Sequence, residues 1–245
     1  MPLTLRFLGV SGFEIRTQAG TTIVVDPFLS GSPEMGLPPS PVSVEELRQV
    51  HLVLVTHGAF DHLGQAVEIA RQTGATLGCG VDVRIHALRQ GVPAGQISKM
   101  IPGSALEVRR VRVRALEARH VSFFESEGAY LSAQPLSFLI RTESETRIYH
   151  SGDTALFSDL KLFAELYRPH IALLCIGAAE EGVAALPPDE AAIAAAWLNA
   201  PVVIPMHYRD GSPEVGVFQT EMAKRRPDIR VVPLEPGGTF QHTAE

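Results

Sequence analysis

The chain has little of several features that would assign it to common classes of protein. Its 245 residues include only two cysteines, Cys79 and Cys175, which cannot form a disulfide framework, so we expect both to be buried structural residues. No apolar run approaches the roughly 20 residues that span a bilayer, and Met1 leads into a strand-like segment without a signal-peptide pattern. We therefore expect a cytoplasmic protein that makes no membrane contact.

The chain also lacks a positive net charge. A formal net charge of -6 argues against nucleic acid as a partner, because phosphate affinity comes mainly from clustered Lys and Arg. The one basic cluster, Arg109–Arg114, alternates charged and apolar residues, which favours a half-buried strand with a solvated face over an anion-binding surface. No Gly-rich phosphate loop or dinucleotide fingerprint is present, so nucleotide-cofactor chemistry is not expected.

No linker-like stretch divides the chain. Hydrophobic residues make up 45% and charged residues 20%, as in folded globular proteins. The densest Pro/Ser/Gly region, Ser30–Ser43, is short and ends in Ser43-Val44-Glu45-Glu46, a capping-box pattern that predicts the start of a helix. We expect a single domain over residues 1–245, with the Ser30–Ser43 segment as a loop over the mouth of a site.

Apolar periodicity predicts strands in both halves of the chain, with helices between them. The predicted strands are Leu3–Leu8, Phe13–Arg16, Thr21–Val25, Leu52–Val55, Ala75–Cys79, Leu106–Glu117, Leu136–Arg141, Arg147–Tyr149, Ile171–Cys175, Val202–Pro205 and a closing strand, Arg230–Pro233. The predicted helices are Gln65–Thr73, Asp159–Leu166 and Asp189–Leu198. Two strand-rich halves with interspersed helices indicate an α/β protein of two packed sheets flanked by helices.

The most informative segment is Thr56-His57-Gly58-Ala59-Phe60-Asp61-His62-Leu63-Gly64. An apolar run leads into it and a helix-like stretch follows, so its polar residues lie where a buried strand ends. The segment supplies two imidazoles and one carboxylate within six positions. Such a set suits a divalent borderline metal such as zinc.

The segment resembles the His-x-His-x-Asp-His motif of the metallo-β-lactamase superfamily, with Ala59 where the second His stands. Four further segments follow the superfamily's order: Val25-Asp26-Pro27-Phe28, His120 after a long alternating run, Tyr149-His150-Ser151-Gly152-Asp153-Thr154, and Ile204-Pro205-Met206-His207-Tyr208. Over nearly its whole length the chain resembles the uncharacterised metal-dependent hydrolases related to L-ascorbate-6-phosphate lactonase. The resemblance implies an αβ/βα four-layer sandwich with a metal site at one edge of the two sheets.

The resemblance also implies two metal positions. The side chains assigned to the second position are all present: Asp61, His62, His207 and a bridging Asp153. Those assigned to the first are His57, His120 and the same Asp153, with Ala59 in place of the fourth ligand. We therefore expect Zn²⁺, one or two ions per chain, in an asymmetric dinuclear or a mononuclear centre. Mn²⁺ or another divalent ion remains an alternative.

Further roles follow from the same resemblance. Asp61 is expected to orient the nucleophile as well as bind metal, and His150 is assigned with it to the catalytic machinery. Asp26 and His150 also suit places behind the metal ligands, because metal-bound imidazoles usually need a carboxylate or carbonyl behind them. A turn-shaping role stays open for Asp26, which precedes a proline. We interpret the remaining histidines as structural: His51, His86, His170 and His242.

The expected function is that of a hydrolase which attacks an ester, lactone or phosphodiester of a small molecule with metal-bound hydroxide. Two alternatives remain open. One is a catalytically degenerate binding protein of the same fold, because Ala59 and Val10 both replace a His of the family pattern. The other is a nuclease of the same superfamily, which the acidic charge argues against; a homo-oligomer is also left open. Candidate pocket walls, by nearness to the proposed ligands, are Phe28, Phe60, Phe123, Phe124, Phe157, Tyr208 and Arg209.

Overall fold

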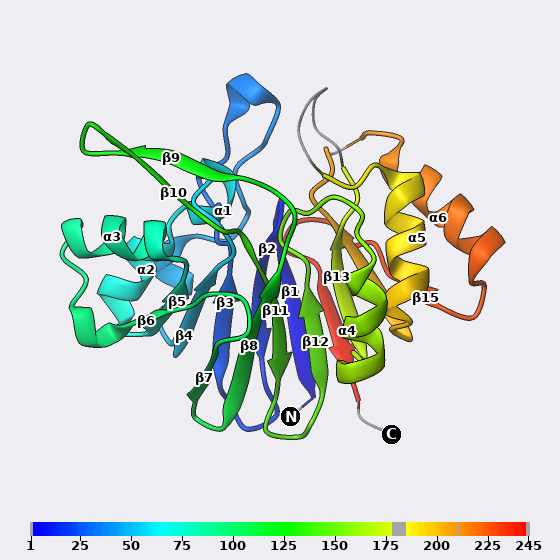
Figure 1. Ribbon diagram of the computed structural model, residues 1–245, viewed down its shortest axis with the longest axis horizontal. Helices are drawn as coiled ribbons and strands as arrows, with labels where there is room; N and C mark the ends of the chain where they lie inside the picture. The colour runs from blue at the N-terminus through cyan, green and yellow to red at the C-terminus, as the bar shows by residue number, and fades with distance from the viewer. Residues whose placement is uncertain (1, 178–184, 210, 244–245) are drawn as a thin grey trace.

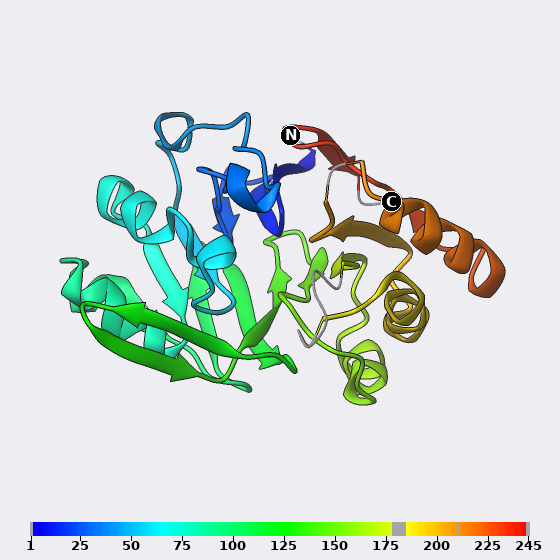
Figure 2. The same ribbon diagram turned by 90° about the horizontal axis from the view of Figure 1, so that it is seen from above.

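Two seven-stranded sheets face each other, and helices cover the outer side of each (Figures 1 and 2). The computed structural model describes residues 2–177, 185–209 and 211–243. Helix, sheet, sheet and helix form the four layers of the predicted αβ/βα sandwich. The prediction of the fold class is confirmed.

The first sheet contains the N-terminal strands. Its order is β16 (Thr239–His242), β1 (Leu3–Gly9), β2 (Gly12–Arg16), β3 (Thr22–Val25), β4 (Leu52–Val55), β5 (Thr76–Cys79) and β6 (Ile97–Lys99). Pairing is antiparallel from β16 to β3 and parallel from β3 to β6. Strand β4 is buried at every position, as its continuous apolar run predicts for a parallel strand covered on both faces. Helices α2 (Ala66–Thr73) and α3 (Val81–Arg89) lie on this half.

The second sheet has the order β15 (Arg230–Val231), β14 (Val202–Met206), β13 (Ile171–Cys175), β12 (Arg147–His150), β11 (Leu136–Arg141), β8 (Val111–Glu117) and β7 (Ala105–Val108). Strands β12 to β15 are parallel, and β7, β8, β11 and β12 pair antiparallel. Its outer helices are α4 (Asp159–Tyr167), α5 (Pro188–Leu198) and α6 (Glu214–Arg225). Outside both sheets lie the hairpin of β9 (Ser122–Ser126) and β10 (Ala129–Ala133), the short helix α1 (Phe60–Leu63) and 3-10 turns at Pro33–Met35, Val44–Glu46 and Ala94–Gln96.

Apolar packing between the layers makes the sheet edges rigid supports. The larger core cluster joins the inner faces of both sheets, where Phe13 of β2 and Phe138 of β11 are fully buried. A second cluster joins the outer face of the first sheet to α2, with Val53 and Ile69 among its members. Burial of each such side chain contributes roughly 1.5–3 kcal/mol. The segments that follow these strands are therefore held in place.

One predicted strand is wrong in its extent. Leu106–Glu117 is not one strand, because the chain reverses between β7 and β8. Arg109 and Arg110 form the turn with φ of 49° and 70°, a left-handed conformation that residues other than glycine adopt infrequently. The apolar alternation slips by one position here, because the apolar residues before the turn are Leu106 and Val108 and those after it are Val111 and Val113, so this slip marks the turn although Gly and Pro are absent. On β8 the arginines are exposed and the intervening residues are buried, in agreement with the predicted solvated face.

The end of the chain also differs from expectation. The predicted closing strand, Arg230–Pro233, is only the two-residue β15, and the chain then crosses to the first sheet as β16. The capping box at Ser43 is present, but it starts a single 3-10 turn instead of a helix. Sequence reasoning also missed α3, α6, β6, β9 and β10.

Other expectations about single residues are met. Cys79 and Cys175 are both free and buried, and burial raises the pKa of Cys79 to about 12 and that of Cys175 to about 11. His51 and His170 play the same structural part in the two sheets, since each Nδ1 accepts a hydrogen bond from the backbone N–H at the start of a neighbouring strand. No helix within the described part of the chain is long and apolar enough to cross a membrane.

Candidate metal centre

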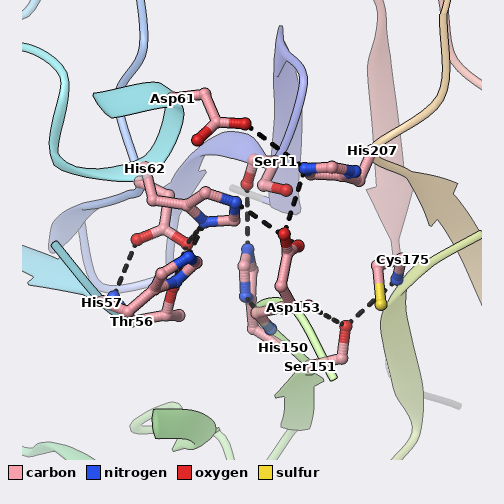
Figure 3. A network of polar contacts seen from close by, with 12 residues as sticks. Ser11, Thr56, His57, Asp61, His62, His150, Ser151, Asp153, Cys175 and His207 are labelled. Carbon is pink, nitrogen blue, oxygen red and sulfur yellow. Dashed lines mark hydrogen bonds and ion pairs between the residues drawn. The ribbon is translucent and has the colours of Figure 1, made fainter. Parts of the chain in front are cut away.

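Polar residues that follow the parallel strands lie at one edge of the molecule. Strand β4 ends at Val55, and the turn of α1 that follows brings Asp61 and His62 back toward the strand ends (Figure 3). Asp153 follows β12 and His207 follows β14, in the other sheet. Residues separated by as many as 150 positions therefore meet in one cluster, in which every residue of the predicted ligand set takes part.

Asp153 lies at the centre of this cluster. Its Oδ1 is 3.3 Å from Nε2 of His62, and its Oδ2 is 3.1 Å from Nε2 of His207. Nε2 of His207 is also 3.4 Å from Oδ2 of Asp61. The ligand atoms of Asp61, His62 and His207 lie within 4.8 Å of one another. The four residues assigned to the second position thus face a common point.

The remaining histidines lie on the other side of Asp153. The His57 ring centroid is 4.1 Å from that of His62 and 5.0 Å from that of His120. Nε2 of His120 is 3.9 Å from Oδ2 of Asp153. His57, His62 and Asp153 also form a three-atom group of metal-ligand spacing. Asp153 is therefore placed between both sets of imidazoles, as its predicted bridging role requires.

The buried polar atoms of the cluster fit a bound cation. Nε2 of His57, His62 and His207, together with Oδ1 of Asp153, are buried and make no hydrogen bond to any described residue. The contacts of His62 and His207 with Asp153, at 3.3 and 3.1 Å, are ion pairs. Buried polar atoms are normally satisfied, so a group of them without hydrogen bonds calls for an explanation, which a bound ion would supply. Imidazole and carboxylate donors are those that zinc and related divalent metals prefer.

The pKa shifts in the cluster also favour a bound cation. Burial opposes ionisation of Asp61, but His207 and His62 outweigh it and lower the pKa of that carboxyl to about 2. Burial likewise opposes the charge on His62, yet Asp153 and Asp26 hold its pKa well above the usual range. Burial and neighbouring His62 lower the pKa of His57 to about 3. The cluster thus attracts positive charge, which a metal ion would supply while displacing protons from the imidazoles.

A second layer of hydrogen bonds orients these ligands. Oδ2 of fully buried Asp26 is 2.8 Å from Nδ1 of His62, which leaves Nε2 of that ring directed at Asp153. Asp26 also accepts hydrogen bonds from the backbone N–H of Thr56 at 2.8 Å and from its hydroxyl at 2.7 Å. Thr56 Oγ1 in turn lies 3.1 Å from Nδ1 of His57. Asp26 therefore occupies the place behind the ligands that the sequence predicted.

Asp26→Asn is expected to weaken metal binding and turnover by about 10–100-fold, because the amide cannot replace the carboxylate that orients His62. Competition with a chromophoric chelator measures the affinity. The isosteric side chain keeps the fold, which thermal unfolding checks. Affinity equal to the parent's would show that Asp26 serves only the turn before Pro27.

His150 lies behind Asp153, and its ring nitrogens are engaged with the backbone (Figure 3). Nε2 is 2.9 Å from the carbonyl oxygen of Ser11, and Nδ1 accepts the N–H of Gly152 at 3.1 Å. These bonds fix the turn that carries Asp153. They favour a positioning role over the direct catalytic role assigned to His150 from sequence.

Backbone conformation is unusual at the same edge. Val10, Asp26 and His207 have φ of 50°, 44° and 57°, and the N–H of His207 donates to the carbonyl of Val10 at 2.6 Å. Gly152 has φ of 55°, and a Cβ there would lie 2.8 Å from a backbone oxygen. Such conformations cost about 1–3 kcal/mol each and cluster at functional sites.

Two supporting residues were missed from the sequence. Ser122 Oγ accepts the backbone N–H of Gly58 at 2.8 Å, and the same hydroxyl donates to the buried carboxylate of Asp82. Because Gly58 follows His57, this chain of bonds ties the ligand-bearing loop to β9 and to the start of α3. Ser122 stands two residues after His120, which was a usable signal, whereas nothing near Asp82 in the sequence points to the site.

The predicted pocket walls divide into two groups. Phe60, Tyr208 and Arg209 line a cavity beside the cluster, and Phe28 packs edge-on against Phe60 at 5.5 Å. The others do not line it: Phe157 is in the core, Phe123 stacks on Tyr130 at the surface of the β9–β10 hairpin, and Phe124 lies against His86 and close to Gly58, the residue after His57. The loop predicted to cover the site contributes Met35 and Leu37 to the cavity.

Comparison with known proteins agrees with this geometry. A model of the beta-lactamase superfamily domain matches residues 21–208. The UPF0173 metal-dependent hydrolase of Methanobrevibacter smithii is 36% identical over 99% of this chain and 98% of its own length. Igni18, a metallo hydrolase from Ignicoccus hospitalis, superposes with a TM-score of 0.82 and 26% identity over 100% of both chains. YhfI of Bacillus subtilis, a metallo-beta-lactamase fold protein, gives a TM-score of 0.69 at 15% identity over 98% of this chain and 99% of its own.

These matches and the two-sheet site define a member of the metallo-β-lactamase superfamily. Within it, the chain belongs to the UPF0173 metal-dependent hydrolases. It is a metal-dependent hydrolase.

Proposed function

We propose that the chain hydrolyses an ester, lactone or phosphodiester of a small molecule with a divalent ion held by Asp61, His62, Asp153 and His207. The observation that supports this most is the gathering of buried, unpartnered nitrogen and oxygen atoms in two adjoining groups of metal-ligand spacing that share His62. His57 and His120, with Asp153, make the weaker first position. Zinc is the proposed metal, because it is a borderline-soft ion that binds both imidazole and carboxylate donors.

Such an ion supplies an activated water nucleophile at neutral pH and polarises the group under attack. The protein's part is to place the reactants. Asp61 and Asp153 stay ionised, since neighbouring histidines lower both carboxyl pKa values. Asp61 lines the cavity as well as the cluster, so its carboxylate accepts a hydrogen bond from the attacking water and orients it toward the substrate.

In the reaction, the water oxygen adds to the acyl carbon or phosphorus and the bond to the leaving oxygen breaks. The proton lost by the water ends on that leaving oxygen. Asp26 and His150 do not contact the reactants in this scheme. They hold His62 and the Asp153 turn in place, which fixes the distances on which orientation depends.

Metal removal tests the proposal. Treatment with dipicolinate should abolish hydrolysis of a panel of aryl esters, lactones and bis(p-nitrophenyl) phosphate, and added Zn²⁺ or Mn²⁺ should restore it. His207→Ala should lose metal and turnover together, because the second position then keeps only three ligands. His242→Ala is the matched control, since that ring stacks near His170 and belongs to neither group of candidate ligands. Turnover that survives complete chelation would contradict the proposal.

A further inference from the structure

We infer that the cavity beside the metal centre binds a compact, uncharged, apolar group of the substrate, next to the bond that is hydrolysed. The inference rests on the proposed function for the identity of the centre, and it adds the substrate class. The cavity has a volume of about 210 Å³. Asp61, Asp153 and His207 line it at the metal centre, so any group bound there touches the reacting atoms.

The remaining walls are mostly apolar: Val10, Met35, Leu37, Phe60 and Tyr208. Met35 and Phe60 expose 44% and 49% of their surface, which is high for large apolar residues beside a site. A ligand that covers them removes this surface from water, and that transfer is favourable by about 25 cal/mol per Å². The walls therefore select an apolar group.

The volume sets the size of that group. An apolar cavity of about 150 Å³ accommodates benzene. A cavity of about 210 Å³ is somewhat larger. It has room for a phenyl ring or a short alkyl chain next to the metal centre.

The walls are built in advance of binding. The loop before Ser40 is closed on itself by reciprocal hydrogen bonds between Ser32 and Leu37 at 2.8 and 3.0 Å. Its base is tied down because Gln65 Oε1 accepts the N–H of Leu29 at 2.7 Å. Gly31 has φ of 65°, and a Cβ there would lie 2.5 Å from the backbone of Pro39. Met35 and Leu37 are thus presented to the cavity by a loop with little freedom.

Val10 completes the apolar wall beside the metal centre. Its carbonyl holds the backbone N–H of His207, so the two residues keep a fixed relation. At the corresponding turn the family pattern has a His, which is polar and able to bind metal. Val10 places a branched apolar side chain there instead. The departure from the pattern therefore has a consequence for the substrate as well as for the metal.

The charges that line the cavity outside the metal centre do not favour an anionic substrate group. Asp61 and Asp153 belong to the centre, where a bound divalent ion would offset their charge, and the rest of the lining contains one carboxylate, Glu214, and one cation, Arg209. Glu214 accepts a hydrogen bond from the hydroxyl of Ser212 at 2.8 Å. A carboxylate or phosphate on the bound group would lose its hydration against the apolar walls and lie close to Glu214. An uncharged group would not.

A homologous ester series tests the inference. With p-nitrophenyl acetate, propionate, butyrate and hexanoate, kcat/KM should rise about fourfold per added methylene until the cavity is filled. The hemisuccinate, with a charged end, should fall at least tenfold below butyrate. Leu37→Asp should flatten the chain-length dependence, because it places a carboxylate in the wall. Leu166→Asp, on the exposed face of α4, is the matched control and should leave the dependence unchanged.

Binding without chemistry supplies an independent readout. In protein with ¹³C-methyl methionine, the Met35 resonance, assigned with Met35→Leu, should shift saturably with benzyl alcohol and stay unshifted with glycerol, an uncharged molecule that has no apolar ring. The zinc-loaded protein is used, and the measurement is repeated after chelation. A shift without hydrolysis of any ester would support the cavity and sink the proposed function. Hydrolysis with a flat series and no shift, or with hemisuccinate preferred, would overturn the inference and leave the proposed function standing.

Discussion

Asp153→Ala is expected to abolish metal-dependent hydrolysis while the chain remains folded. Among the described residues, Asp153 is the one carboxylate in contact with imidazoles of both metal positions, through His62, His120 and His207. Loss of a residue that orients a metal ligand lowers metal affinity or activity by about 10–100-fold, so loss of a shared ligand should lower activity by more than roughly 100-fold. Steady-state kinetics on the best substrate of the panel, with elemental analysis of the same sample, measures both effects.

The fold should tolerate the change. Removing Asp153 takes one carboxylate partner from His62 and one from His207. Asp26 still contacts His62, and Asp61 still contacts His207. Losing one partner of a buried pair costs up to about 3–5 kcal/mol, and imidazoles that give up their protons reduce that cost. Asp228→Ala is the control, because that carboxylate lies at the surface beside Arg226. Turnover equal to the parent's in folded Asp153→Ala protein would refute the metal-hydroxide scheme.

The clustering of the candidate ligands was partly predictable, because several of them follow strands. Continuous apolar runs identify β4 and β14, and the carboxyl ends of parallel strands share one edge of a sheet. His57 and His207 come soon after these strands and Asp153 comes soon after β12, so each is expected at such an edge. The family resemblance supplied the pairing of the two sheets, which periodicity alone does not determine.

Other residues of the site do not follow this sequence pattern. Ser122 and Asp82 act through hydrogen bonds to backbone and to each other, and neither stands in a pattern of metal-ligand spacing. The residues that line the cavity come from the loop before Ser40, from helices α1 and α6 and from the segments after several strands, so their grouping depends on tertiary packing. Sequence nearness to the ligands found Phe60 and Tyr208 but also included Phe157, which lies in the core.

The missed elements of the fold have similar causes. Helix α6 buries only Phe218 and Met222 and contains a glycine, so its helical pattern is weak. Strand β16 is short, polar and mostly exposed, and it exists because β1 offers an edge to pair with. The turn between β7 and β8 has no glycine to mark it. Tertiary contacts determine these features, whereas a long apolar run is enough to identify a strand such as β4 from the sequence.

Ala59→His is expected to raise the metal content from about one toward about two zinc ions per chain, because it restores a fourth donor to the first position. The backbone at Ala59 is extended, with φ of -59° and ψ of 147°. Side chains two residues apart in extended backbone point to the same side, so a histidine here would join His57 and meet His120. Nε2 of His57 already lacks a hydrogen-bond partner among the described residues, which leaves it ready to bind.

Titration of parent and variant with zinc and with manganese, in competition with a chromophoric chelator, measures the change. Ala59→Leu is the matched control, since it adds bulk without a donor atom and should leave the stoichiometry at the parent's value. Turnover need not rise with metal content, because Val10 also departs from the family pattern and shapes the cavity for its own substrate. Tight binding of two ions by the parent would show that another group replaces the missing ligand, and the asymmetric centre would then be wrong.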